Sequence, residues 1–210
     1  RRSSDLSISV KADLEHLVAE TESRLGPVDV LVCNAASNPY YGPLAGISDA
    51  QFRKILENNV LSNHWLIQMV APGMVARRDG AIVIVSSIGA LKGSPVIGAY
   101  NVSKAADLQL VRNLAVEFGA HNIRVNAISA GPIKTLAASG IGDFRYILKW
   151  NELNSPLRST VTIEEVGDAA AFMLSDMGRG ITGEIQHVDA GYHVVGMKNP
   201  EAPDITLEKN

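Results

Sequence analysis

Short apolar runs alternate along the chain with longer stretches whose apolar residues recur at helical spacing. The continuous runs predict buried strands, as is typical of parallel sheets, and the periodic stretches predict helices. Strands are expected at residues 28–35, 80–86, 122–129 and 184–189. Helices are expected at residues 14–25, 49–77 and 98–118, after Thr162, and within a segment at residues 136–160. This alternation indicates a parallel α/β sheet with helices on both faces.

Local signals indicate where several of these helices begin and end. Ser48 and Thr162 each stand three residues before a Gln or Glu, the pattern of a capping box, so helices should begin after them. Glycine and proline at residues 26–27 end the first helix, and Gly119 ends the helix at 98–118.

Composition and charge exclude several classes of protein. The 210 residues suffice for one ordinary domain, and 19 Lys and Arg against 22 Asp and Glu give no basic face for nucleic acid. No apolar run approaches the roughly 20 residues that span a bilayer. The single Cys33 permits neither an intrachain disulfide nor a cysteine zinc site, and the five histidines share no metal-ligand spacing. We therefore expect a cytoplasmic protein without a metal.

Several polar residues fall where parallel sheets place their sites. Tyr100 and Lys104 lie four residues apart in a predicted helix, hence on one face. An ammonium close to a phenol favours the phenolate, which makes the tyrosine a usable proton donor and acceptor. Ser87 and Asn34 follow two predicted strands at the carboxyl edge of the sheet. Asn59 is a polar residue inside an apolar helix.

Each of these residues also has a purely structural interpretation. Ser87 is then a strand-to-loop hydrogen bond, Asn34 a turn residue and Asn59 part of a solvated helix face. The aromatic residues of the segment 136–160 have two interpretations as well, since they either line a substrate pocket or pack that segment. These aromatic residues are Phe144, Tyr146 and Trp150.

Taken together, the motifs resemble one family. In chain order they are Asn34-Ala-Ala36, Asn58-Asn59-Val60, Ser86-Ser87, Tyr100-x-x-x-Lys104, Ala130–Thr135, and Ile181–Glu184 followed by Val188–Gly191. Over residues 28–192 the chain resembles the short-chain dehydrogenase/reductases. The resemblance implies a doubly wound, Rossmann-like parallel sheet in a single NAD(P)-binding domain at residues 1–197. A polar tail at residues 198–210 is expected to be a flexible extension.

The resemblance also implies a role for each site residue. Tyr100 passes a proton to or from the substrate oxygen, and Lys104 holds the nicotinamide ribose and assists the tyrosine. Ser87 polarises the carbonyl or alcohol, and Asn59 anchors the water of a proton relay. The implied cofactor is NAD or NADP, bound by Asn34, Ala35, Ala36, Tyr100, Lys104, Pro132, Ile133 and Thr135.

The chain departs from the family pattern before its first predicted strand. The family begins with a strand and a Gly-x-x-x-Gly-x-Gly turn that cradles the pyrophosphate, and this turn is absent from the sequence. We therefore expect the family's first strand, glycine loop and second strand to be lacking, with residues 5–10 ending the third. The strand at 28–35 should then expose an apolar edge. Residues 178–183 match Gly-x-Gly-x-x-Gly, but they follow a helix, which indicates a turn into the last strand.

Three interpretations of function remain open. Residues 126–192 resemble bacterial enoyl-acyl-carrier-protein reductase, whereas residues 28–118 resemble carbonyl- or alcohol-type members. The enoyl reductase pattern has tyrosines seven and seventeen residues before the lysine, where this chain has Ile97 and Ser87. The favoured interpretation is hydride transfer between NAD(P)(H) and a carbonyl/alcohol pair. Enoyl thioester reduction is the alternative, and a truncated, non-catalytic member or scaffold is the third.

The resemblance also suggests partners. We expect a small-molecule or acyl-chain substrate, no nucleic acid and no membrane. Further copies of the chain should form a homodimer or homotetramer through the helices at 49–77 and 98–118.

Overall fold

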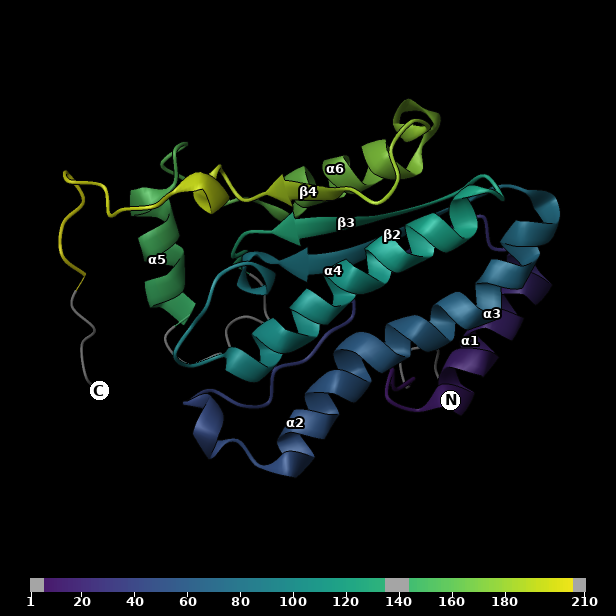
Figure 1. The fold of residues 1–210 in the computed structure, drawn as a ribbon, viewed down its shortest axis with the longest axis horizontal. Coiled ribbons are helices and arrows are strands. Elements are labelled where there is room, and N and C mark those ends of the chain that lie inside the picture. The colour runs from purple at the N-terminus through teal and green to yellow at the C-terminus, as the bar shows by residue number, and fades with distance from the viewer. Residues whose placement is uncertain (1–5, 135–143, 206–210) are drawn as a thin grey trace.

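Four parallel strands form the sheet of the computed structural model, which describes residues 6–134 and 144–205. The strands are β1 (Val30–Cys33), β2 (Gly80–Ser87), β3 (Ile123–Ala130) and β4 (Ile185–Val188), and their order in the sheet follows their order in the chain. Because every pair is parallel, the carboxyl ends of all four strands lie at the same edge of the sheet (Figure 1).

Helices cover both faces of this sheet, as predicted. They are α1 (Lys11–Leu25), α2 (Asp49–Leu56), α3 (Ser62–Arg77), α4 (Gly98–Gly119), α5 (Phe144–Asn154) and α6 (Ile163–Leu174). Side chains alternate along a strand. Ile82 and Ile84 of β2 therefore join α3 and α4 in one core, whereas Val83 joins Met173 of α6 in another. α1 lies alongside α3 (Figure 1).

Both capping boxes are present, and the predicted helix at 49–77 is helical throughout, with a change of pattern in its middle. A five-residue π-turn, Glu57–Leu61, separates α2 from α3. In a regular helix, neighbouring residues point about 100° apart. Within the π-turn both Asn58 and Asn59 are buried, at 8% and 0% exposed.

One expectation for the start of the chain is wrong within the described residues. Residues 6–10 form a turn rather than the end of a strand, with the amide of Val10 donating to the carbonyl of Ser7. Near the other end, the described residues include a contact between the tail and α5. Asn199 is anchored to α5, because its backbone amide donates to Asn154 Oδ1 and its side chain donates to Leu153 O.

The edge of the sheet at β1 is apolar, as predicted. Val30 and Val32 remain 46% and 44% exposed. β1 pairs with β2 alone among the described strands. No helix in the described ranges combines the length and the apolar character that crossing a membrane requires.

Candidate active site

The carboxyl edge of the sheet brings the predicted site residues together. Ser87 ends β2, and Tyr100 and Lys104 lie on the first turns of α4. Asn34 directly follows β1, and residues 132–133 follow β3. The parallel sheet therefore places residues that are up to about a hundred positions apart around one edge.

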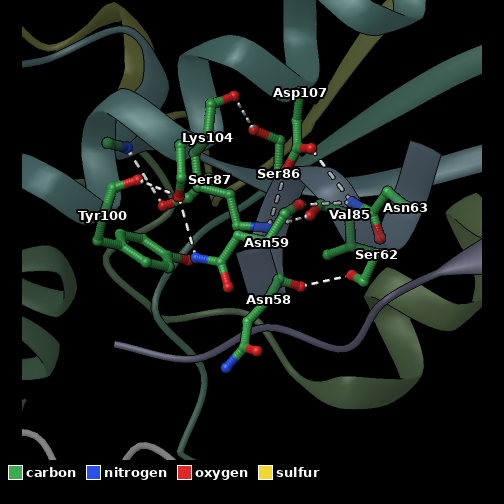
Figure 2. Close-up of polar contacts among 12 residues, drawn as sticks. Asn58, Asn59, Ser62, Asn63, Val85, Ser86, Ser87, Tyr100, Lys104 and Asp107 are labelled. Atoms are coloured by element: carbon green, nitrogen blue, oxygen red, sulfur yellow. Dashed lines mark hydrogen bonds and ion pairs between the residues drawn. The ribbon is translucent and has the colours of Figure 1, made fainter. Parts of the chain in front are cut away.

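Lys104 is buried and firmly held beside Tyr100 (Figure 2). Its Nζ donates to the backbone oxygen of Val85 at 2.9 Å and lies 3.1 Å from Oδ2 of Asp107. The same ammonium lies 5.9 Å from the centroid of the Tyr100 ring. A positive charge is thus fixed close to a half-buried phenol.

Asn59 lies inside the protein, so its interpretation as part of a solvated helix face is wrong. Its Oδ1 accepts from the backbone amide of Ser37 at 2.8 Å. Its Nδ2 donates to the backbone oxygen of Ser37 and to Oγ of Ser103, both at 3.0 Å. Ser103 in turn donates to the backbone oxygen of Tyr100. Asn59 therefore connects the π-turn, the loop after β1 and α4.

The hydroxyl of Ser87 accepts a hydrogen bond from the backbone amide of Gly89 at 3.2 Å. A serine hydroxyl keeps its own proton when it accepts, so Ser87 can still donate to a ligand. The turn is tight. A Cβ at Gly89 would lie 2.3 Å from Oδ1 of Asn101, so a larger residue there would require the Asn101 side chain to shift.

Asp107 and Asn63 belong to the site as well, and the sequence interpretation missed them. Asp107 is fully buried, and its Oδ1 accepts from Nδ2 of Asn63 at 3.1 Å. Burial raises the pKa of Asp107, while the charge of Lys104 and hydrogen bonds from Lys104 and Asn63 act in the opposite direction. A signal was present, since Asp107 and Asn63 lie about one helical turn after Lys104 and Asn59, on the same helix faces.

A family model of the short-chain dehydrogenase/reductases, described as enoyl-(acyl carrier protein) reductase, matches residues 4–193. The chain belongs to the short-chain dehydrogenase/reductase family. The protein is therefore an oxidoreductase of a family that works with nicotinamide cofactors, and the fold expected from its motifs is confirmed.

Known members of the family are similar over most of this chain. Enoyl-[acyl-carrier-protein] reductase [NADH] 1 of Rhizobium meliloti is 45% identical over 202 residues, which are 95% of this chain and 74% of that protein. The crystal structure of enoyl-(acyl-carrier-protein) reductase from Anaplasma phagocytophilum in complex with NAD has a TM-score of 0.86 and 38% identity. That match covers 95% of this chain and 75% of the other.

A carbonyl-type member is similar too. A 7α-hydroxysteroid dehydrogenase, complexed with NADH and 7-oxo glycochenodeoxycholic acid, has a TM-score of 0.81 and 34% identity. The match covers 89% of this chain and 72% of that chain. The fold alone thus accommodates both branches of this dehydrogenase/reductase family.

The donors at the sheet edge fit the nicotinamide ribose of the family's cofactor. Two of the three N–H groups of Lys104 have partners among the described residues, which leaves one for a ribose hydroxyl. Asn34, Ala35 and Ala36 are exposed, and Pro132 and Ile133 are half-buried. Thr135 lies outside the described residues.

Two further expectations concern the flanks of the site. Residues 178–183 form the turn into β4, as predicted, with the amide of Gly183 donating to Val125 O. The rings of Tyr146 and Trp150 stack, and Trp150 Nε1 donates to the hydroxyl of Tyr192 at 2.9 Å. These two aromatic residues therefore pack α5 against the segment after β4.

Proposed function

We propose that the protein reduces enoyl thioesters of acyl carrier protein with NADH. The observation that supports this most strongly is the 45% identity over 202 residues to a reductase named for that substrate and cofactor. It favours the second of the three interpretations drawn from the sequence over carbonyl/alcohol exchange.

Each site residue then has a defined part in the reaction. Bound NADH supplies the hydride. Tyr100 donates a hydrogen bond to the carbonyl oxygen of the thioester, where negative charge develops. Lys104 stabilises that charge from its position 5.9 Å from the Tyr100 ring centroid, and its remaining N–H holds the ribose. Asn59 fixes the backbone of Tyr100 through Ser103, and a water relay from Asn59 stays a prediction.

The proposal depends on Tyr100. The enoyl reductase pattern has a tyrosine where this chain has Ile97, and an isoleucine side chain cannot donate a proton. Replacing Tyr100 by Phe keeps the ring and removes the hydroxyl. We expect a loss of about 10²–10⁴-fold in kcat, with an unchanged melting temperature. The assay follows NADH oxidation with a crotonyl thioester of acyl carrier protein. Failure of the unmodified protein to oxidise NADH with any enoyl thioester would overturn the proposal.

Carbonyl reduction is the second candidate, and Ser87 favours it. The Ser87 hydroxyl keeps its own proton for a carbonyl oxygen while it accepts from Gly89. A hydroxysteroid dehydrogenase is 34% identical in a match that covers 89% of this chain. Ser87→Ala separates the two candidates. For enoyl reduction, in which Tyr100 is the main donor, we expect at least about a tenth of kcat to remain. For carbonyl reduction, losing a donor to the developing oxyanion should cost about 10²-fold or more.

A panel of ketones, assayed beside the enoyl thioester, gives the control for that comparison. Ketone reduction that collapses in Ser87→Ala, without any enoyl activity in the unmodified protein, would establish the second candidate. Ser175→Ala is the matched variant, since Ser175 caps a distant turn and its loss should leave both activities unchanged.

The choice of NADH over NADPH and the assembly belong to the same proposal. The relatives named above act with NADH or were solved with NAD. Equilibrium binding of NADH and of NADPH to the purified protein, followed by tryptophan fluorescence, tests the choice. Exposed apolar residues on α4 support a homodimer or homotetramer. The cytoplasmic location stays a prediction.

A further inference from the structure

Lys104 carries its charge in a region that excludes water. Its side chain is 3% exposed and that of Asp107 is 0% exposed, with Nζ 3.1 Å from Oδ2. Burial favours the neutral form of an amine, so a buried ammonium needs a negative partner to keep its proton. Among the described residues, Asp107 is the carboxylate that pairs with Lys104. Asp107 therefore supplies the negative charge that faces the Lys104 ammonium.

The other carboxylate oxygen of Asp107, Oδ1, accepts a hydrogen bond from a side chain of α3. Asn63 of α3 donates from Nδ2 to Oδ1 of Asp107 at 3.1 Å and to the backbone oxygen of Asn59 at 2.7 Å. Figure 2 shows this series of contacts between α4 and the π-turn. It connects Lys104 with Asn59, the two residues that flank Tyr100 in the candidate site.

We propose that Asp107 is a positioning residue that holds Lys104 in place and in its charged form, and that Asn63 orients Asp107. The inference rests on the proposed function, in which the ammonium acts beside Tyr100. Val85 O and Asp107 together fix Nζ from two sides, which leaves its third N–H for the ligand. Asp107 thus acts on the reaction through Lys104 and does not itself touch the substrate.

The other groups around this pair supply no substitute charge. Cys33 of β1 stays a neutral thiol, because burial and, secondarily, the charge of Asp107 raise its pKa to about 12. α3 contributes the uncharged amide of Asn63. β2 contributes the backbone oxygen of Val85, and on α4 the nearest titratable neighbour is Tyr100.

Asp107→Asn tests the inference, because it keeps the shape of the side chain and removes its charge. We expect Lys104 to lose its proton at a pH at least about one unit lower than in the unmodified protein. NMR of the protein labelled at lysine Cε follows this proton directly, with the Lys104 signal assigned through Lys104→Arg. In parallel, the ratio of the variant's kcat to that of the unmodified protein should rise about tenfold as the pH is lowered through the range in which Lys104 regains its proton.

Val111→Ala is the matched control for a merely structural role. Val111 lies one turn further along α4 and is 0% exposed. This variant should lower the melting temperature, leave the titration of Lys104 unchanged, and keep its kcat ratio constant with pH. Should Asp107→Asn fail to fold, Asn63→Ala decides instead. It removes a donor to Asp107, and Lys104 should titrate at a lower pH by a smaller amount.

Two results would overturn the inference. One is a Lys104 that titrates in the folded variant as it does in the unmodified protein. The other is a kcat that falls by the same factor at every pH. If the unmodified protein reduces no enoyl thioester, the proposed function is wrong. The titration of Lys104 then decides by itself whether Asp107 holds Lys104 in its charged form.

Discussion

At the carboxyl end of β4, the rings of His187 and His193 stack with their centroids 4.0 Å apart. Burial lowers the pKa of His187, and the charge of His193 lowers it further, while the charge of Asp189 acts in the opposite direction. Nε2 of His187 is buried and has no hydrogen-bond partner among the described residues. The fold therefore opposes the protonation of this side chain.

This opposition makes stability depend on pH with a definite sign. The unfolded chain takes up a proton at His187 at a higher pH than the folded protein does. Above the unfolded value, about 6.5, both forms are neutral, and as the pH falls through it the free energy of unfolding should decrease. Urea unfolding between about pH 7.5 and 5.5 measures this slope. We expect His187→Leu to reduce it.

His16→Gln is the control for that slope, because His16 is exposed on α1 and its replacement should leave the pH dependence as it is. An equal slope in the unmodified protein and in His187→Leu would contradict the prediction.

Among the helices, α6 begins with a capping box that can be tested directly. Thr162 Oγ1 accepts from the amide of Glu165 at 3.1 Å, and Glu165 Oε2 accepts from the amide of Thr162 at 2.7 Å. Thr162→Ala should lower the free energy of unfolding by about 1 kcal/mol, because it leaves an amide without its partner. Thr162→Ser keeps the oxygen and should lose much less. Equal losses in the two variants would show that the methyl group, not the cap, is responsible.

The elements differ in how far the sequence predicts them, and the reason is the range of the contacts that define them. Both capping boxes were predictable, since each joins residues three positions apart. The π-turn was not, because the burial of Asn59 depends on Ser37 and Ser103, which lie 22 and 44 positions away. Hydrophobic periodicity carries no information on such contacts, so it predicted the helix at 49–77 but not the π-turn inside it.

For the molecule as a whole, parallel pairing explains why the site could be predicted in part. In a parallel sheet the carboxyl ends of the strands lie at one edge, whatever elements connect the strands. The positions of Ser87 and Asn34 at that edge therefore follow from the strand pattern of the sequence. The role of Asp107 does not, because it depends on the packing of α4 against α3, which brings Asn63 to its carboxylate.

The outer face of α4 gives the last prediction, which concerns assembly. Val102 and Val116 are 46% and 86% exposed, and they lie about four helical turns apart, hence on nearly the same face. Exposed apolar residues in line on one helix favour burial against a second copy of the same surface. We expect the double variant Val102→Glu with Val116→Glu to dissociate the assembly, because each subunit would bring carboxylates against those of its partner. Sedimentation velocity measures the mass of the assembly in solution.

A matched change elsewhere separates this surface from a general effect of charge. Leu25, at the end of α1, is 83% exposed. Leu25→Glu adds a carboxylate at a comparably exposed apolar position on another helix, and it should leave the mass unchanged. If the double variant keeps the mass of the unmodified assembly, the outer face of α4 is not the interface. A loss of mass in Leu25→Glu alone would place the interface at α1 instead.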